Sequence, residues 1–482
     1  MATQSPVRAA WCGVFTAWCC LSAGAAVYTV DTTDDGVAAD AVTTLREAVR
    51  AANTNPGPDQ IVLPAGHFVL TAAGAGEDAA LTGDLDVNDH LAITGAGADV
   101  TLLDGNGSDR VLFLNWNIEV VLSDLAVIGG LAPVGAGIYN QSTLRVVRCN
   151  IALNQASVYG GGLHNFGGRV QMSDSAIFDN LAADQGGGGV DVAGGSVTLT
   201  NCTVSGNISQ GGAGIYRDSG WISIAHCTVA SNWAQQSAGG AFDLSAAYSS
   251  IIVGNQAPLL PDLAGGLTSQ GFNLFGVGAP VGTLPSDVVT SDVRLTPLDF
   301  AAATPVHRLL PGSPAINRGD PAATTNTLAN DQRGPGFPRV RGLRVDIGAF
   351  EHQQPDDDLD GMPDEWEVAF ALNPTNAADG LLDPDLDSFV NADEFVADTV
   401  PTNGASFPRI TGLAGAGDGS TWLLTVPSST ACLYRVETAA ELGGTWSTGV
   451  VATAGLPGFT DLVITSAAPS HFRVQVARPA TP

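Results

Sequence analysis

The chain has 482 residues, a formal net charge of −29 at pH 7 and 59 glycines, and only 14% of its residues are charged. A chain this acidic repels nucleic acid and anionic lipid, whose recognition depends on basic patches, so neither is expected as a partner. Every basic residue is arginine, and the lack of lysine excludes Schiff-base catalysis and a phosphate-binding P-loop.

Residues 1–26 have the layout of a secretory signal peptide, with Arg8, an apolar run over residues 9–21 and small residues over 22–26. A lipid anchor at Cys19 is the alternative, but Trp18 before it is larger than the small residue expected there. A membrane-spanning helix needs about 20 apolar residues. The apolar run is shorter, so we expect a secreted protein with no transmembrane span.

Residues 44–53 are predicted to form a short helix. Thr44 and Glu47 make a capping box, and the apolar residues Leu45, Ala48, Val49 and Ala52 share one face. A helix with one apolar face at the start of a repeat array is suited to cover the open end of the core. We therefore expect an N-terminal helical cap.

A repeat fills residues 122–255. Its blocks are spaced 24, 26, 27, 25 and 23 residues apart. One position of each block holds Leu125, Cys149, Ser175, Cys202, Cys227 or Ser250, and another holds Gly130, Asn154, Asn180, Asn207, Asn232 or Asn255. Repeats of this length that show period-two apolar alternation and carry glycine clusters predict short strands stacked in a solenoid.

The predicted fold is all-β, a right-handed parallel β-helix over residues 27–352. Asparagine suits a fixed corner of such a coil, because it tolerates left-handed backbone and its amide can bond to the asparagine one coil above. Cys202 and Cys227 should lie on adjacent coils. A disulfide between them is the alternative, but parallel stacked side chains give poor disulfide torsions, so we expect buried thiols.

Two segments resemble a known protein class. TLREAVRAANTNPGPDQIVLPAG (residues 44–66) resembles the CSLREA segment that begins secreted bacterial β-helix proteins, with Thr43 and Thr44 in place of its Cys-Ser. LLPGSPAINRGDP (309–321), DQRGPGFPR (331–339) and VDIGAFEH (345–352) resemble the closing region of the choice-of-anchor class. This resemblance implies a pectate-lyase-like solenoid in a protein that is extracellular or held at the bacterial cell surface.

Two loops have the ligand spacing of calcium-binding EF-hand loops. Positions 1, 3, 5, 7, 9 and 12 are Asp356, Asp358, Asp360, Met362, Asp364 and Glu367 in the first loop, and Asp383, Asp385, Asp387, Phe389, Asn391 and Glu394 in the second. Position 7 would offer its carbonyl, and hard oxygen ligands favour calcium. The alternative is a solvated acidic linker.

The pair resembles thrombospondin type 3 repeats. This resemblance implies structural calcium in a linker over residues 353–400. The second site should be the weaker one, because Ser388 stands where the sharp turn favours glycine. Beyond the linker, period-two runs separated by Gly, Pro and Ser predict a small C-terminal β-sandwich over residues 401–482.

The outward positions after the glycine clusters form a candidate site for polysaccharide or extracellular matrix, since aromatic faces offer platforms for sugar rings. These residues are Tyr139, His164, Asp191, Tyr216 and Phe242. A glycosidase needs paired carboxylates, and the column has one. Arg333 and Arg339 lie in the closing phrase and are interpreted as structural. We therefore expect a non-enzymatic structural or adhesive protein, with a polysaccharide lyase or glycoside hydrolase as the alternative.

Overall fold

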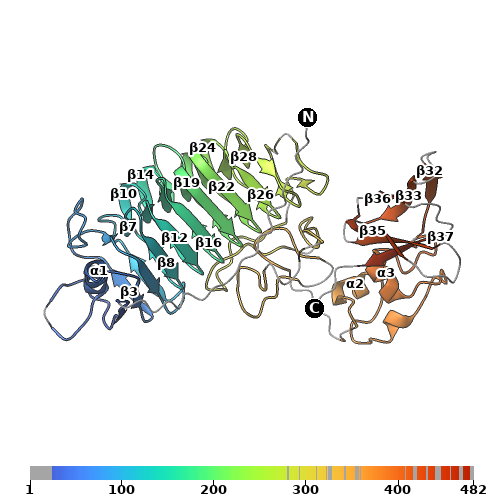
Figure 1. Ribbon diagram of the computed structural model, residues 1–482, viewed down its shortest axis with the longest axis horizontal. Helices are drawn as coiled ribbons and strands as arrows, with labels where there is room; N and C mark the ends of the chain where they lie inside the picture. The colour runs from blue at the N-terminus through green and yellow to red at the C-terminus, as the bar shows by residue number, and fades with distance from the viewer. Residues whose placement is uncertain are drawn as a thin grey trace.

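The computed structural model describes residues 24–477, except 39, 279, 281, 293, 311, 322, 324–327, 341–343, 353–357, 359, 408, 416–420, 430–431, 440–446, 456–457 and 466–470. Most of the predicted signal peptide and Asp356 therefore lie outside the described residues. The parallel β-helix is confirmed: the strands of successive coils pair in parallel and stack side by side along the solenoid (Figure 1). No described helix has the length and apolarity needed to cross a membrane.

Three sheets form the walls of the solenoid. Sheet A contains β1 (Val27–Thr29), β2 (Asp59–Val62), β4 (Leu85–Val87), β5 (Leu91–Thr94), β7 (Leu112–Leu114), β8 (Glu119–Ser123), β11 (Ile138–Asn140), β12 (Thr143–Val147), β15 (Leu163–Asn165), β16 (Arg169–Ser173), β19 (Val190–Thr200), β22 (Ile215–Ala225), β25 (Ala241–Phe242), β26 (Ala246–Tyr248), β28 (Leu263–Ala264) and β29 (Thr268–Ser269). Sheet B contains β3 (Gly66–Val69), β6 (Thr101–Asp104), β9 (Ala126–Ile128), β13 (Asn150–Ala152), β17 (Ala176–Phe178), β20 (Thr203–Ser205), β23 (Thr228–Ala230), β27 (Ile251–Ile252), β30 (Leu274–Phe275) and β31 (Val288–Val289). Sheet C contains β10 (Leu131–Val134), β14 (Gln155–Tyr159), β18 (Leu181–Ala182), β21 (Ile208–Gly211) and β24 (Trp233–Ser237).

The predicted asparagine corner forms a continuous ladder of hydrogen bonds between sheets B and C. Each amide nitrogen donates to the next asparagine's Oδ1 at 2.9–3.0 Å, and the last donates to Asp262. Each Oδ1 also accepts a backbone N–H from the preceding coil. The ladder residues are Asn154, Asn180, Asn207, Asn232 and Asn255, all buried.

The interior is filled by stacked apolar side chains, as the repeat predicts. Cys149, Cys202 and Cys227 are buried free thiols within this core, in agreement with the expectation of thiols rather than a disulfide. The equivalent position of other coils holds Leu125, Ser175 or Ser250, so it accepts only small or apolar side chains.

The predicted cap is helix α1 (Leu45–Thr54), which lies at one end of the solenoid (Figure 1). Both hydrogen bonds of the Thr44–Glu47 capping box are present. Arg46, a residue of α1, is fully buried and pairs with Asp35 at 2.8 Å. Its guanidinium also donates to the carbonyl of Gly83 at 2.7 Å. The guanidinium thus ties the helix to the chain segments on either side of it.

The described residues between 295 and 352, here named the covering segment, lie against the outer face of sheet B. Asn150 Nδ2 donates to the Ala303 carbonyl at 2.8 Å, and Thr203 Oγ1 donates to Gln332 Oε1 at 2.6 Å. Ser205 Oγ and His307 Nε2 share a hydrogen bond of 2.8 Å. The phrases that resemble a closing region therefore cover the side of the solenoid.

The C-terminal part begins with α2 (Asp364–Ala369), η1 (Asp379–Leu381) and α3 (Asn391–Ala397). Two antiparallel sheets follow: β32 (Gly412–Gly415), β33 (Thr421–Ser428) and β36 (Gly458–Thr465) in one, and β34 (Leu433–Ala439), β35 (Ser447–Ala454) and β37 (His471–Ala477) in the other. Buried side chains of both sheets, including Leu424, Tyr434 and Leu462, form one apolar cluster.

Replacement of a ladder asparagine should strongly destabilise the solenoid. Asn207→Ala removes the acceptor of the Asn180 N–H and the donor to the Ile177 carbonyl, so we expect a loss of about 3 kcal/mol in the free energy of unfolding. Gln171→Ala, at an exposed position of β16, should change it by less than about 0.5 kcal/mol. Urea unfolding measures both values, and equal effects would contradict a structural role for the ladder.

Candidate functional site

The five predicted contact residues lie in one column of sheet A. Tyr139 on β11 pairs with His164 on β15, His164 with Asp191 on β19, Asp191 with Tyr216 on β22, and Tyr216 with Phe242 on β25. Phe113 on β7 extends the column. The rings stack, with centroids 5.3 Å apart for Phe113 and Tyr139 and 5.2 Å apart for Tyr216 and Phe242.

The glycine clusters before these strands are explained by how closely the column side chains approach them. Gly160 has φ +63°, and a Cβ there would lie 2.7 Å from the Cβ of His164. Gly187 has φ +71°, and its Cβ would lie 2.6 Å from that of Asp191. Only glycine meets both the backbone conformation and the close contact. The column therefore depends on the glycines that precede it.

His164 and Asp191 form a buried pair at the centre of the column. His164 Nδ1 and Asp191 Oδ2 lie 2.5 Å apart, and the two residues are only 5% and 1% exposed. Burial raises the pKa of Asp191, and the hydrogen bond from His164 opposes this rise. The expectation that both side chains are available for outward contact is thus wrong: His164 and Asp191 support the column from within.

Two aromatic residues that the sequence reasoning missed complete the surface. Trp116 is 46% exposed and Phe166 is 43% exposed, and their ring centroids lie 6.0 Å apart. Phe166 also packs on Tyr139 and His164, at 6.3 Å and 6.1 Å. Each directly follows an asparagine, Asn115 one residue beyond β7 and Asn165 at the end of β15, a signal that could have identified them.

Phe113, Trp116, Tyr139, His164 and Phe166 together are named the aromatic patch. The guanidinium of Arg110 lies 5.5 Å from the ring centroid of Phe113 and 5.3 Å from that of Tyr139. Arg110 also pairs with Asp84 at 2.8 Å. Burial raises the pKa of Asp84 to about 7 even so. The patch is therefore a set of contiguous rings whose nearest cation already has an anionic partner.

Each predicted calcium loop brings three of its described carboxylates together. Asp358, Asp360 and Glu367 offer oxygens that all lie within 4.8 Å of one another, and so do Asp383, Asp385 and Asp387. Asp364 and Asn391 are the first residues of α2 and α3, so each loop leads directly into a helix.

Hydrogen bonds inside each loop explain why the carboxylates converge. The N–H of Met362 donates to Asp360 Oδ1 at 2.8 Å, and that of Phe389 donates to Asp387 Oδ1 at 3.0 Å. Such turns fold each aspartate back over its own loop. Gly361 has φ +91° and Ser388 has φ +82°, so the second loop makes the same sharp turn with a residue that is strained there.

Glu367 belongs to the first carboxylate cluster, and Glu394 lies near enough to Asp385 and Asp387 for their charges to raise its pKa. Both side chains are fully buried, and both oxygens of Glu367 and Oε2 of Glu394 lack a hydrogen-bond partner among the described residues. Burial first, and then neighbouring aspartates, raise the pKa of each carboxyl to about 7. An unpaired buried carboxylate is costly. These residues therefore fit a hard divalent cation such as calcium, which would supply the missing contacts.

Comparison with known proteins adds little beyond the fold. No family model and no curated protein matches the sequence. Among solved structures, the crystal structure of pectate lyase Pel9A is similar, with 15% sequence identity and a TM-score of 0.36 over 68% of this chain and 96% of that chain. A likeness at this level does not transfer an activity.

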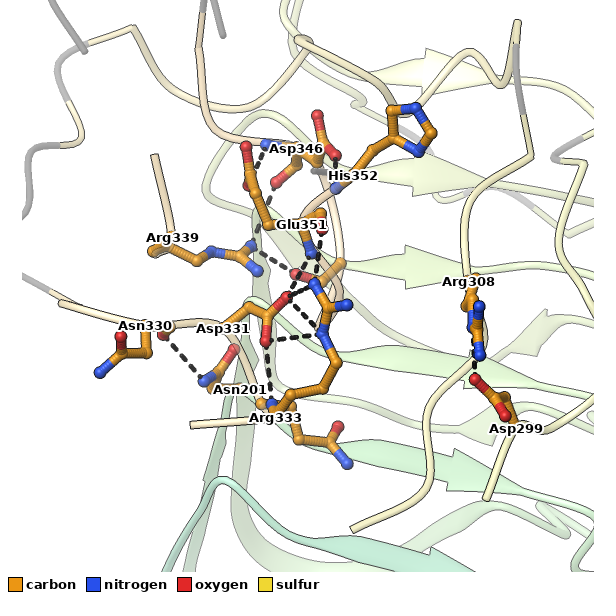
Figure 2. Close-up of polar contacts among 12 residues, drawn as sticks. Asn201, Asp299, Arg308, Asn330, Asp331, Arg333, Arg339, Asp346, Glu351 and His352 are labelled. Atoms are coloured by element: carbon orange, nitrogen blue, oxygen red, sulfur yellow. Dashed lines mark hydrogen bonds and ion pairs between the residues drawn. The ribbon is translucent and has the colours of Figure 1, made fainter. Parts of the chain in front are cut away.

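Arg333 and Arg339 lie in the covering segment and have structural partners (Figure 2). Arg333 pairs with buried Asp331, and its guanidinium lies 3.9 Å and 4.0 Å from the ring centroids of Phe337 and Phe350. Arg339 is 1% exposed and donates to the carbonyl of Asp346 and to His226 Nδ1, both at 3.1 Å. Neither guanidinium is placed to act on a ligand.

Removal of Glu394 should eliminate one calcium site. With Glu394→Gln the second loop loses its buried charge, so we expect calorimetric titration to change from two calcium ions per chain to one, because the carboxylate at position 12 is the chief anchor of such loops. Asp393→Asn alters the exposed neighbouring carboxylate on the same helix and should leave both sites intact. An unchanged stoichiometry in Glu394→Gln would contradict the assignment.

Calcium binding should weaken as pH falls below about 7. Each site must release the proton that Glu367 or Glu394 holds, since their pKa values are raised to about 7, so affinity should fall about fivefold between pH 7 and pH 6. Without calcium the folded state holds protons that the unfolded state lacks. Its stability should therefore decrease as pH rises from the ordinary glutamate pKa of 4.5 through about 7. Affinity that does not vary with pH would contradict this coupling.

Proposed function

We propose that this protein is a secreted or surface-displayed adhesive protein that binds a neutral polysaccharide through the aromatic patch, without turnover. The observation that supports this function is the contiguity of the patch. Five ring-bearing residues from three successive coils contact one another, and Trp116 and Phe166 present almost half of their surfaces to solvent. Exposed aromatic clusters of this kind are unusual on a soluble surface and mark binding sites.

Carbohydrate is the ligand class that fits such rings. Sugar rings have apolar faces that pack on aromatic side chains, while their hydroxyl groups remain available to water and polar neighbours. The net charge of −29 disfavours uronic-acid polymers. Arg110 does not offset this charge at the patch, because it pairs with Asp84. We therefore favour neutral over acidic polysaccharides.

The calcium loops would have a structural role in this proposal. Their aspartates and buried glutamates lie between the solenoid and the C-terminal sheets in the sequence. Calcium bound there would neutralise the clustered carboxylates and stiffen the segment. A stiff connection would hold the solenoid and the C-terminal part in a defined relation, which suits a protein that presents a surface.

A polysaccharide-cleaving enzyme is the second candidate, and the His164–Asp191 pair favours it. A buried carboxyl with a raised pKa beside a histidine is a common arrangement for proton transfer. However, Asp191 is 1% exposed and His164 is 5% exposed, so neither is open to a polymer. A glycosidase also needs a second carboxylate across the sugar, and Asp243 is instead paired with Arg217.

Loss of the exposed rings should abolish retention on polysaccharide. We expect Trp116→Ala with Phe166→Ala to weaken binding to neutral polysaccharides by at least about tenfold, because two stacking platforms are removed. Trp221→Ala, which alters an equally exposed tryptophan on β22, should bind as the unmodified protein does. Affinity electrophoresis against neutral and uronic-acid polymers measures both.

Two outcomes would contradict the adhesive proposal. One is retention that depends on Trp221 and not on the aromatic patch. The other is release of new chain ends that stops with His164→Ala or Asp191→Asn, which would establish the enzyme instead.

A further inference from the structure

Asp59 is a buried carboxylate that lacks a cationic partner. It is the first residue of β2 and is 1% exposed. Its Oδ1 accepts hydrogen bonds from Asn55 Nδ2 at 2.7 Å and from the backbone N–H of Ala26 at 2.8 Å, while its Oδ2 has no partner among the described residues. The ion pairs of the described arginines and histidines involve other carboxylates. Because an unpaired buried charge is costly, this carboxylate favours a cation beside it.

The Ala26 nitrogen, which already touches this carboxylate, stands at the beginning of the regular fold. Ala26 directly precedes β1, which pairs in parallel with β2. The carbonyl of Ala26 accepts a hydrogen bond from the N–H of Gln60 at 2.9 Å, so its backbone is held on both sides. Gly24 and Ala25 are exposed. The strand pairing of the solenoid therefore begins at Ala26.

The residues before Ala26 match the cleavage pattern of a secretory signal. Such sites have small residues at the last and third-last positions of the removed segment, and the sequence Ala23-Gly24-Ala25 supplies both. Cleavage one residue later also leaves small residues at these positions. However, it would remove the nitrogen that contacts Asp59 and the carbonyl that Gln60 binds. The contacts therefore favour cleavage before Ala26.

We propose that the peptide bond between Ala25 and Ala26 is a processing site, and that the α-ammonium group released there forms a buried salt bridge with Asp59. This inference rests on the proposed secretion of the protein. A signal-removing endopeptidase would catalyse the step with water as the co-reactant. The C–N bond breaks, the carbonyl carbon of Ala25 gains the hydroxyl group and becomes a carboxyl, and the nitrogen of Ala26 gains the protons.

The released group meets what the Asp59 carboxylate lacks. An amide nitrogen has one N–H, whereas an ammonium group has three and a positive charge. It can keep the bond to Oδ1 and donate to Oδ2, which has no partner among the described residues. Asn55 Nδ2 loses its bond to the carbonyl of Gly24 on cleavage, but it keeps the bond to Asp59.

Processing would thus complete the first strand pair of the solenoid. Before cleavage, Asp59 is buried against a neutral amide, and its charge destabilises the fold. After cleavage the same carboxylate holds the new end of the chain against β2. The processed protein should therefore be more stable than its precursor, which suits a chain that is exported before it folds.

The N-terminal residue of the exported protein tests the position of the site. We expect the full chain, expressed in a secreting bacterium and collected from outside the cytoplasm, to begin at Ala26 in N-terminal sequencing and intact mass measurement. The chain has no lysine, so its α-amino group is the only primary amine. An amine-acetylating reagent therefore reports on that group alone.

The rate of acetylation tests the salt bridge. We expect the folded protein to react at least about tenfold more slowly than the protein in urea, because the carboxylate keeps the amine protonated. Asp59→Asn preserves the size of the side chain and removes its charge, so the folded variant should react nearly as fast as the unfolded protein. Asp34→Asn removes an exposed charge from the same N-terminal segment and should leave the slow rate unchanged.

A second variant tests the salt bridge without altering Asp59. One glycine added before Ala26 moves the amine away from the carboxylate and should restore the fast reaction. Unchanged far-ultraviolet circular dichroism shows that each variant folds. An exported chain that begins at another residue, or an amine whose rate in the folded protein depends on neither change, overturns the proposal.

The failure of this inference is distinguishable from failure of the proposed function. A chain that stays in the cytoplasm with residues 1–25 attached overturns the processing site together with secretion. Export with a different first residue overturns the processing site alone. Loss of polysaccharide retention, with Ala26 as the first residue and a slow amine, contradicts only the adhesive role.

Discussion

The hydrogen-bonded asparagine ladder is the constraint on which the solenoid depends. Each ladder amide bonds to the next coil through its own nitrogen and accepts a backbone N–H through its oxygen. A corner residue with both groups must occupy the same place in every coil. Insertions occur at other corners, as in the turn from sheet C to sheet A, where Gln155 and Leu163 are 8 residues apart but the paired Leu181 and Val190 are 9 apart. The variable repeat spacing follows from this, while the stacking register stays constant.

Because the register is constant, side chains at each outward position form a row along the solenoid. The candidate binding residues therefore lie in rows. The row on sheet A carries the stacked rings, and the outer face of sheet B is covered by a distant segment of the chain. The row on sheet C is mostly apolar and consists of Leu131, Gln155, Leu181, Ile208 and Trp233. Side chains about 4.8 Å apart in such rows contact one another directly. Each face therefore acts as a continuous strip, which favours extended ligands and partners over small molecules.

The sequence predicted the features that follow a local or repeated pattern, and it missed the contacts between segments that do not repeat. The coil, the asparagine corner, the capping box and the loop spacing all follow from local or periodic patterns. The burial of His164 and Asp191 depends on how neighbouring rings pack, and Phe166, for example, comes from the turn between β15 and β16. The covering segment is bound through contacts such as Ser205 with His307, which are 102 residues apart. Periodic sequence patterns do not indicate contacts between residues so far apart in the chain.

The predicted calcium loops follow a different logic, because each places several carboxylates close together. Arginine is the only permanent cation available in this sequence, and several arginines of the solenoid are paired with its own aspartates, as with Arg46 and Asp35 or Arg148 and Asp124. Without a metal, burial favours the protonated form of Glu367 and Glu394, and this raises the pKa of each carboxyl to about 7. Protons and a divalent cation thus compete for the same buried oxygens, and the folded loops need one or the other.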